Sequence, residues 1–108
     1  MEANATEPQV PAGLPEPPER TIHEAEVASA FSHPLRLCLL RKLATQPYCV
    51  NELVNSAGVS QPMVSRHLAT LRKLGLVSCR VEGRKRCYDL EHPDFVNAML
   101  TALGQAPE

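Results

Sequence analysis

The sequence predicts a single, mainly helical domain of about five helices with a small β-hairpin. Apolar residues recur at helical spacing in several segments that open with a capping residue or a proline. Alternating apolar positions flank Glu82-Gly83-Arg84, a pattern typical of two strands joined by a turn. The chain has 108 residues, which suits one domain of ordinary size.

The composition is that of a soluble globular chain, with 44% hydrophobic and 21% charged residues. No apolar run approaches the ~18 residues of a membrane span. The acidic N-terminus (residues 1–4) lacks the apolar segment of a secretory signal, so we expect a protein that is not exported. Aromatic residues make up only 4% of the chain, so the core must be aliphatic.

The chain divides into three parts. Residues 1–19 contain five prolines and few residues that could pack, which predicts a disordered acidic arm. Residues 20–104 carry the helical and strand patterns of the folded domain, and residues 105–108 form a short tail.

The first two helices are marked by their caps. Thr21 and Glu24 have the spacing of a capping box, which predicts a first helix from Ile22 to about Phe31. Ser32 is the expected cap of the second helix, with Pro34 in its first turn. The predicted buried stripe of this helix is Leu35, Leu39, Leu40 and Leu43.

The next two helices form a close pair. The third covers about residues 50–57, and Gly58 suits the left-handed turn that follows it. Ser60 caps a fourth helix over about residues 61–74, whose inward face holds Val64, Leu68 and Leu71. Two helices joined by a tight turn with glycine are typical of a helix-turn-helix.

The last elements are a hairpin over residues 76–81 and 85–90 and a fifth helix from Pro93 to about Leu103. The fifth helix has an apolar face that the rest of the domain does not need for its own core. With Ile22 on the first helix, this face predicts a symmetric dimer, the alternative being packing within one chain. The residues of the face are Phe95, Met99, Ala102 and Leu103.

Charge is distributed unevenly along the chain. The net charge is only −1, but residues 1–30 carry −5, residues 31–90 carry +7 and residues 91–108 carry −3. Residues 55–81 contain no acid. A basic centre between acidic ends indicates a polyanionic partner.

A basic hairpin after a helix-turn-helix predicts a winged helix-turn-helix that binds DNA. The second helix of such a pair enters the major groove, and the hairpin holds phosphates. The fourth helix presents Gln and Arg, the side chains that recognise adenine and guanine edges. The candidates on its outer face are Gln61, Ser65, Arg66, Thr70 and Arg72, and those on the hairpin are Arg80, Arg84, Lys85 and Arg86.

Four stretches in order resemble the ArsR/SmtB family of bacterial repressors. They are "FSHPLRLCLLRKL" (31–43), "CVNELV" (49–54), "VSQPMVSRHLATLRKLGLV" (59–77) and "EGRKRCYDL" (82–90). The resemblance covers about residues 21–103 and implies a homodimer, paired through the first and last helices. This dimer would bind a double-stranded operator in the bacterial cytoplasm, at the nucleoid, until an effector releases it.

The resemblance also implies which residues face DNA. These are Ser60, Gln61, Pro62, Ser65, Arg66 and His67 at the fourth helix, and Arg84 with its neighbours on the hairpin. For His67 the alternative is a place beside the core, because it follows the inward-facing Val64 by three positions.

The metal sites of the family fit this chain poorly. The site on the last helix would use His92 and Asp94 but would also need a second histidine, which the helix lacks. We therefore expect this site to be absent. The other site is a weak candidate for zinc or another thiophilic metal, with Cys49, Glu52 and His23 as ligands. The alternative is that Cys49 is a small buried hydrophobic residue.

The four cysteines are expected to be reduced thiols, because nothing marks the chain for export. Alternation along the hairpin directs Cys79 inward with Tyr88, which leaves Cys87 exposed beside basic residues. Redox control through Cys87 or Cys38 is therefore a second hypothesis for the effector.

Two other functions remain to be compared with DNA binding. An enzyme is not expected, because the sequence lacks Cys-x-x-Cys, a Gly-rich phosphate loop and His-Glu-x-x-His. The alternatives are a protein-interaction module that has lost DNA binding and a redox-responsive regulator that senses no metal. Salt-dependent DNA binding would separate the repressor from the interaction module.

Overall fold

The computed structural model describes residue 13 and residues 18–108 of the chain. Five α-helices, one short 3-10 helix (η1) and three strands follow one another in the described part. The predicted mainly helical winged fold is confirmed. Most of the predicted arm, residues 1–12 and 14–17, lies outside the described residues. The elements are α1 (Pro18–Ala28), η1 (Ser29–Phe31), α2 (Pro34–Leu43), β1 (Tyr48–Cys49), α3 (Val50–Ala57), α4 (Gln61–Lys73), β2 (Val77–Glu82), β3 (Lys85–Leu90) and α5 (Pro93–Gly104).

The first helix starts earlier than its sequence signal suggested. The prediction of a capping box at Thr21 is wrong, because α1 already begins at Pro18 and Thr21 lies inside the helix. The Thr21 hydroxyl is buried there without a hydrogen-bond partner among the described atoms. Glu24 instead accepts a hydrogen bond from Arg20 Nε at 3.1 Å, one helical turn away.

The cap of α2 also differs from the prediction. Ser32 closes η1, and both its amide and its hydroxyl donate to the carbonyl of Ser29. His33 caps α2 in its place, because its Nδ1 accepts a hydrogen bond from the amide of Leu35 at 3.1 Å. Pro34 stands in the first turn, where its missing N–H costs nothing.

The core is aliphatic, as the composition predicted, and it lies between α2, α3, α4 and the sheet. The inward stripes of α2 and α4 are confirmed, apart from Leu35, which is only partly buried. Gly58 adopts the left-handed conformation (φ 69°) that lets α4 turn away from α3. Ser60 caps α4, and its hydroxyl accepts from the amide of Met63 at 3.4 Å. The largest fully buried side chains are Leu39, Leu40, Leu43, Leu53, Leu68, Leu71, Val64 and Val96.

The sheet has three strands instead of two, in the order β1-β3-β2. The hairpin β2–β3 is confirmed, and Gly83 (φ 63°) stands in its turn. The additional strand, β1, has two residues and pairs with β3 in the register Tyr48↔Tyr88 and Cys49↔Cys87. A two-residue strand is too short to produce a recognisable alternation in the sequence.

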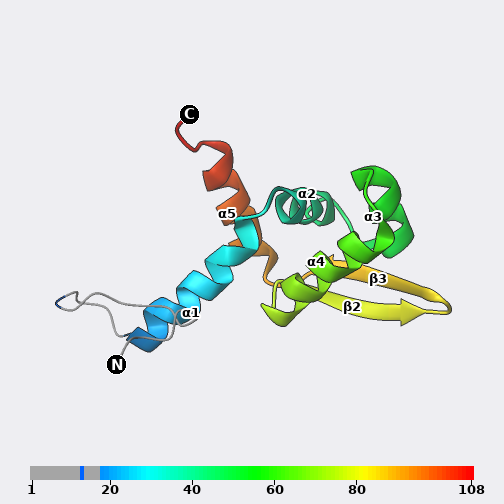
Figure 1. Cartoon of the computed structure of the whole chain (residues 1–108), viewed down its shortest axis with the longest axis horizontal. Coiled ribbons are helices and arrows are strands. Elements are labelled where there is room, and N and C mark those ends of the chain that lie inside the picture. Colours follow the sequence, from blue (N-terminus) through cyan, green and yellow to red (C-terminus); the bar gives the residue numbers. More distant parts are fainter. Residues whose placement is uncertain (1–12, 14–17) are drawn as a thin grey trace, which may run out of the picture.

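The outer elements leave the helical body in different directions. In Figure 1 the hairpin extends to one side, and the N-terminal end of α1 reaches to the opposite side, whereas its C-terminal end lies beside α5 near the centre. Helix α5 buries Val96 and Leu100, whereas Phe95 remains 43% exposed and packs edge-on against Phe31. None of the described helices has the length and apolar character needed to cross a membrane.

Candidate nucleic-acid interface

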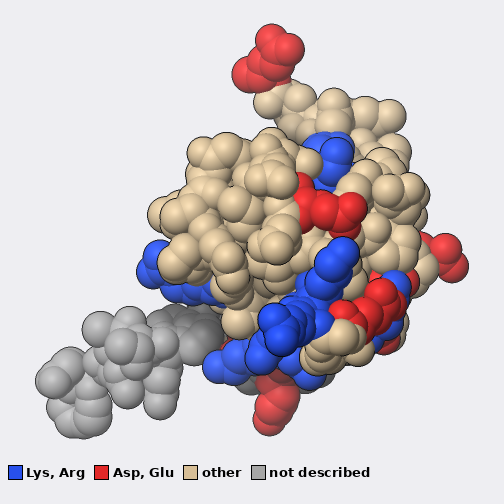
Figure 2. Space-filling model, turned by 90° about the vertical axis from the view of Figure 1, so that its right-hand side faces the viewer, with Lys and Arg blue, Asp and Glu red and all other residues tan. Residues whose placement is uncertain are grey.

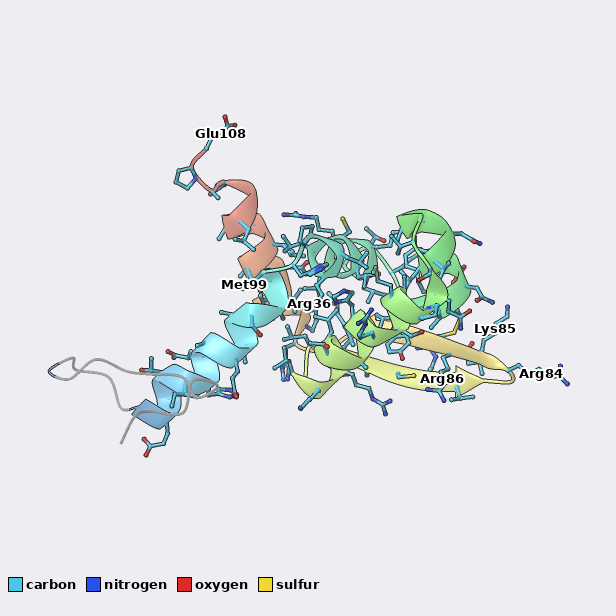
Figure 3. All side chains as sticks on the ribbon, in the orientation of Figure 1. Arg36, Arg84, Lys85, Arg86, Met99 and Glu108 are labelled. Atoms are coloured by element: carbon cyan, nitrogen blue, oxygen red, sulfur yellow. A yellow bond between two sulfur atoms is a disulfide. The ribbon has the colours of Figure 1, made fainter. Side chains whose placement is uncertain are left out.

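An open groove of about 1120 Å³ lies between the helix-turn-helix and the hairpin. Figure 3 shows Arg84, Lys85 and Arg86 at and near the far end of the hairpin. The helices contribute the other wall. The lining residues are Cys49, Val50, Asn51, Glu52, Gln61, Ser65, Ala69, Arg72, Lys73, Glu82, Arg84, Lys85, Arg86 and Tyr88.

The groove is strongly basic. Five of its lining residues are Lys or Arg and two are Glu, and Figure 2 shows Lys and Arg gathered along this end of the molecule. Both acids have local partners. Glu82 pairs with Arg80, whose pKa this contact raises, and Glu52 Oε1 accepts the amide of Cys49 at 2.8 Å. A polyanion would therefore meet a positive field here.

Helix α4 is divided between core and groove by its helical period. Val64, Leu68 and Leu71 are buried on one face, which turns Gln61, Ser65 and Arg72 toward the groove. Four other predicted DNA contacts, at Ser60, Pro62, Arg66 and Arg80, are exposed but lie outside the groove lining.

His67 lies between α4 and α2. Its ring centroid is 4.3 Å from that of His33, and its Nδ1 is 3.3 Å from Nη1 of Arg36. Burial lowers the pKa of His67 below its ordinary value, and electrostatic interaction with the neighbouring His33, Arg36 and Arg66 lowers it further. This position favours the alternative noted from the sequence, a histidine beside the core.

The three metal-ligand candidates do not come together. The sulfur of Cys49 is bonded to Cys87, and Glu52 is engaged with the start of α3. His23 lines a separate pocket with Phe95 and Met99. Within residues 18–108 and residue 13, no group of three His, Cys, Asp or Glu side chains could hold a metal ion. Within one chain, the described residues therefore do not assemble the predicted zinc site.

Two expectations for the cysteines are wrong: that all four are reduced thiols, and that Cys87 is exposed. Cys87 is only 3% exposed, and it forms a disulfide with Cys49 instead of remaining a free surface thiol. Hairpin alternation did not include β1, which places Cys49 opposite Cys87 in the register, so that the two side chains lie on the same face of the sheet. Cys79 is partly buried and pairs across the hairpin with Tyr88; it is free, as is the exposed Cys38.

The apolar face predicted for dimerisation borders a second pocket of about 670 Å³. This pocket lies between α1, the end of α4 and the start of α5, and Phe95 and Met99 line it together with Val27. Figure 3 shows Met99 where α1 and α5 meet. Ile22 is partly buried, whereas Ala102 and Leu103 are exposed.

Sequence reasoning missed some of the groove. Asn51 and Glu52 come from the start of α3, which the sequence did not place beside the hairpin. Lys73 and Ala69 extend the α4 wall. Only Lys73 had a signal that could have been used, because it follows Arg72 in the acid-free segment 55–81.

Known proteins resemble this chain over most of its length. The transcriptional repressor SmtB of Mycobacterium tuberculosis is 35% identical over 97 residues, which are 88% of this chain and 72% of SmtB. The crystal structure of NolR from Sinorhizobium fredii has 35% identity and a TM-score of 0.69, covering 85% of this chain and 94% of NolR.

A third relative has been described as a dimer. The homodimeric winged helix-turn-helix DNA-binding domain from Mycobacterium bovis has 25% identity and a TM-score of 0.72, over 87% of this chain and 90% of that domain. The sequence model for "Bacterial regulatory protein, arsR family" matches residues 33–78, which span α2, the helix-turn-helix and the start of β2. The chain belongs to the arsR family of bacterial transcriptional regulators.

Proposed function

We propose that this chain is a repressor that binds a double-stranded DNA operator as a homodimer and is released from it by an effector. The single observation that carries the proposal is the basic groove between α4 and the hairpin. A polyanion that entered it would contact a helix and a hairpin at once, which is how winged helix-turn-helix proteins hold DNA.

The two walls of the groove have different roles in this proposal. Gln61 and Ser65 on α4 carry side chains that donate and accept hydrogen bonds at base edges. Arg84, Lys85 and Arg86 are exposed on the hairpin and suit contacts to phosphate, which are independent of sequence. Base recognition is therefore assigned to α4 and most of the salt-dependent affinity to the hairpin.

The proposed dimer forms through α1 and α5. The exposed apolar residues of α5 and the neighbouring pocket offer a continuous surface for a second copy. The related domain described as homodimeric supports a dimer. A two-fold dimer would present two α4 helices to a palindromic operator.

The proposal is tested by titrating the full-length protein, reduced and oxidised in separate titrations, against DNA from upstream of its own gene. Fluorescence anisotropy at several salt concentrations should give tight binding that weakens steeply as salt rises, by about 0.9 log unit of affinity per log unit of salt for each phosphate contact. Lys42→Ala is a control for the groove lysines, because Lys42 on α2 lies over the ring of Tyr48 and does not line the groove. Absence of salt-sensitive binding would favour the protein-interaction module instead.

The dimer is tested by replacing Phe95 with Glu. Desolvating a carboxylate at the interface should convert the protein to a monomer in sedimentation velocity, with the helical circular dichroism retained. Val81→Glu on the hairpin is the matched control, because Val81 is 66% exposed and lies away from α1 and α5. A dimeric Phe95→Glu protein would refute pairing through this face.

A further inference from the structure

The Cys49–Cys87 disulfide joins the two walls of the groove. Cys49 is the N-cap of α3, the first helix of the helix-turn-helix. Cys87 lies within β3, directly after the basic segment 84–86 of the hairpin. The bond spans 38 positions of sequence, so it links elements whose relative position determines the width of the groove.

The two bonded cysteines differ in exposure. Cys49 is partly exposed and lines the groove, whereas Cys87 is 3% exposed. The groove therefore offers a small thiol a path to Cys49 from the side on which DNA is proposed to bind. The first turn of α3 adds backbone N–H groups beside Cys49, which favour negative charge on a departing or attacking sulfur.

We propose that Cys49 and Cys87 form a reversible thiol–disulfide switch that tightens operator binding when oxidised, and that DNA in the groove shields it. The reagent is a low-molecular-weight thiol or its disulfide. This inference rests on the DNA-binding function proposed above, because the switch acts on the same groove.

The small thiol and its disulfide supply and accept all the electrons that the exchange needs. For reduction, a thiolate attacks Cys49 Sγ, the bond to Cys87 breaks, and Cys87 leaves as a thiolate that takes up a proton. A second thiolate then attacks the small-molecule sulfur of the mixed disulfide held by Cys49, and Cys49 leaves as a thiolate that takes up a proton. The products are one small-molecule disulfide and two protein thiols. Oxidation is the reverse, so the small disulfide gains the two electrons that the protein loses.

The effect on DNA binding follows from how little else holds β1 to β3. The two strands pair through only Tyr48↔Tyr88 and Cys49↔Cys87. The disulfide keeps the start of α3 against the hairpin, so both walls meet DNA as one rigid unit. Without the bond, part of the binding free energy would be needed to fix the start of α3 against the hairpin, whose own strands stay paired and whose base stays packed in the core through Val77 and Tyr88. We therefore expect the reduced protein to bind its operator about fivefold or more weakly, within the usual range of coupling.

The first experiment counts thiols in the full-length protein without DNA. The protein is equilibrated with mixtures of glutathione and glutathione disulfide, quenched with acid, denatured and labelled with a maleimide. Free thiols should fall from four to two as the mixture becomes oxidising, with Cys49 and Cys87 in one linked peptide. Four thiols at every ratio, or a linkage through Cys38 or Cys79, would overturn the switch.

The second experiment measures operator affinity in both states. Wild type and the control Cys38→Ala should both bind more tightly when oxidised, because Cys38 is exposed on α2 and unpaired. Cys49→Ala and Cys87→Ala should bind alike in both states, near the affinity of the reduced protein. If a variant fails to fold, the test is the difference in operator affinity between oxidised and reduced wild type. Equal affinities in the two states would overturn the inference.

The third experiment measures the rate at which glutathione reduces the disulfide. Saturating operator DNA should slow the reaction at least severalfold, whereas an equal rate with and without DNA would refute shielding through the groove. Failure of the two proposals can be distinguished. Operator binding without thiol cycling removes only the switch, and thiol cycling without DNA binding in either state removes the proposed function as well.

Discussion

Arg36 joins three parts of the fold through hydrogen bonds and contacts of its guanidinium. Its Nε donates to the carbonyl of Ala30 at 3.2 Å, and its Nη2 donates to that of Ser29 at 2.8 Å. Its Nη1 lies 3.3 Å from Nδ1 of His67 on α4. Figure 3 places Arg36 in the centre of the molecule, between α1 and α4. The guanidinium therefore holds η1 and α4 against α2.

Replacing Arg36 with Met should destabilise the fold by about 2 kcal/mol. Methionine keeps an apolar stem but removes every donor. Each hydrogen bond to a carbonyl contributes roughly 0.5–1.5 kcal/mol, and charge on the donor raises this value, whereas partial exposure lowers it. The carbonyl of Ala30 belongs to a residue that is 0% exposed, so its loss is the larger part. The melting temperature should fall by about 10 °C.

The assay is urea unfolding followed by circular dichroism, at one fixed protein concentration because a dimer makes stability depend on concentration. Arg41→Met is the matched control, because Arg41 is exposed on the same helix and its side chain makes no hydrogen bond to any described residue. If the two variants lie within about 0.5 kcal/mol of each other, the bridging role of Arg36 is refuted.

Three further predictions concern the interface and the core. Arg66→Ala should weaken operator binding and relax base preference. Lys85→Ala should weaken binding to all sequences alike and reduce the slope of log affinity against log salt by about one. A changed base preference for Lys85→Ala would contradict its role as a phosphate contact. Because the pKa of His67 is lowered in the folded state, the unfolded chain binds more protons below pH 6.5. Wild type should therefore lose stability relative to His67→Asn as pH falls from 7 to 5, and the opposite trend in urea unfolding would exclude that environment. Leu40→Ala should cost about 2–5 kcal/mol, since Leu40 is 0% exposed; a loss below about 1 kcal/mol in the same assay would contradict tight packing there.

Elements with a local signal were predicted well. The spacing of apolar residues, Ser60 and Gly58 located α3 and α4 within a residue, because a helix repeats its contacts every turn and its caps act within three residues. The basic hairpin followed from Gly83 and the alternation around it. Much of the groove lining could therefore be named from the sequence.

Elements that depend on distant partners were missed or misplaced. The strand β1 exists only because β3 supplies its hydrogen-bond partners. The disulfide, the burial of Cys87 and the failure of the Cys49 metal site all follow from that pairing. His33 replaced Ser32 as a cap because η1 had already engaged Ser32.

By itself, the sequence determined the winged helix-turn-helix, the aliphatic core and the basic character of the groove, because helical period, turn chemistry and charge are local properties of the chain. Only the tertiary structure decided which side chains meet across it: Cys49 with Cys87, and Arg36 with His67. These partners are 38 and 31 positions apart, and no local preference encodes a contact over that distance. Such contacts form only when the packing of the core brings the helices and strands together.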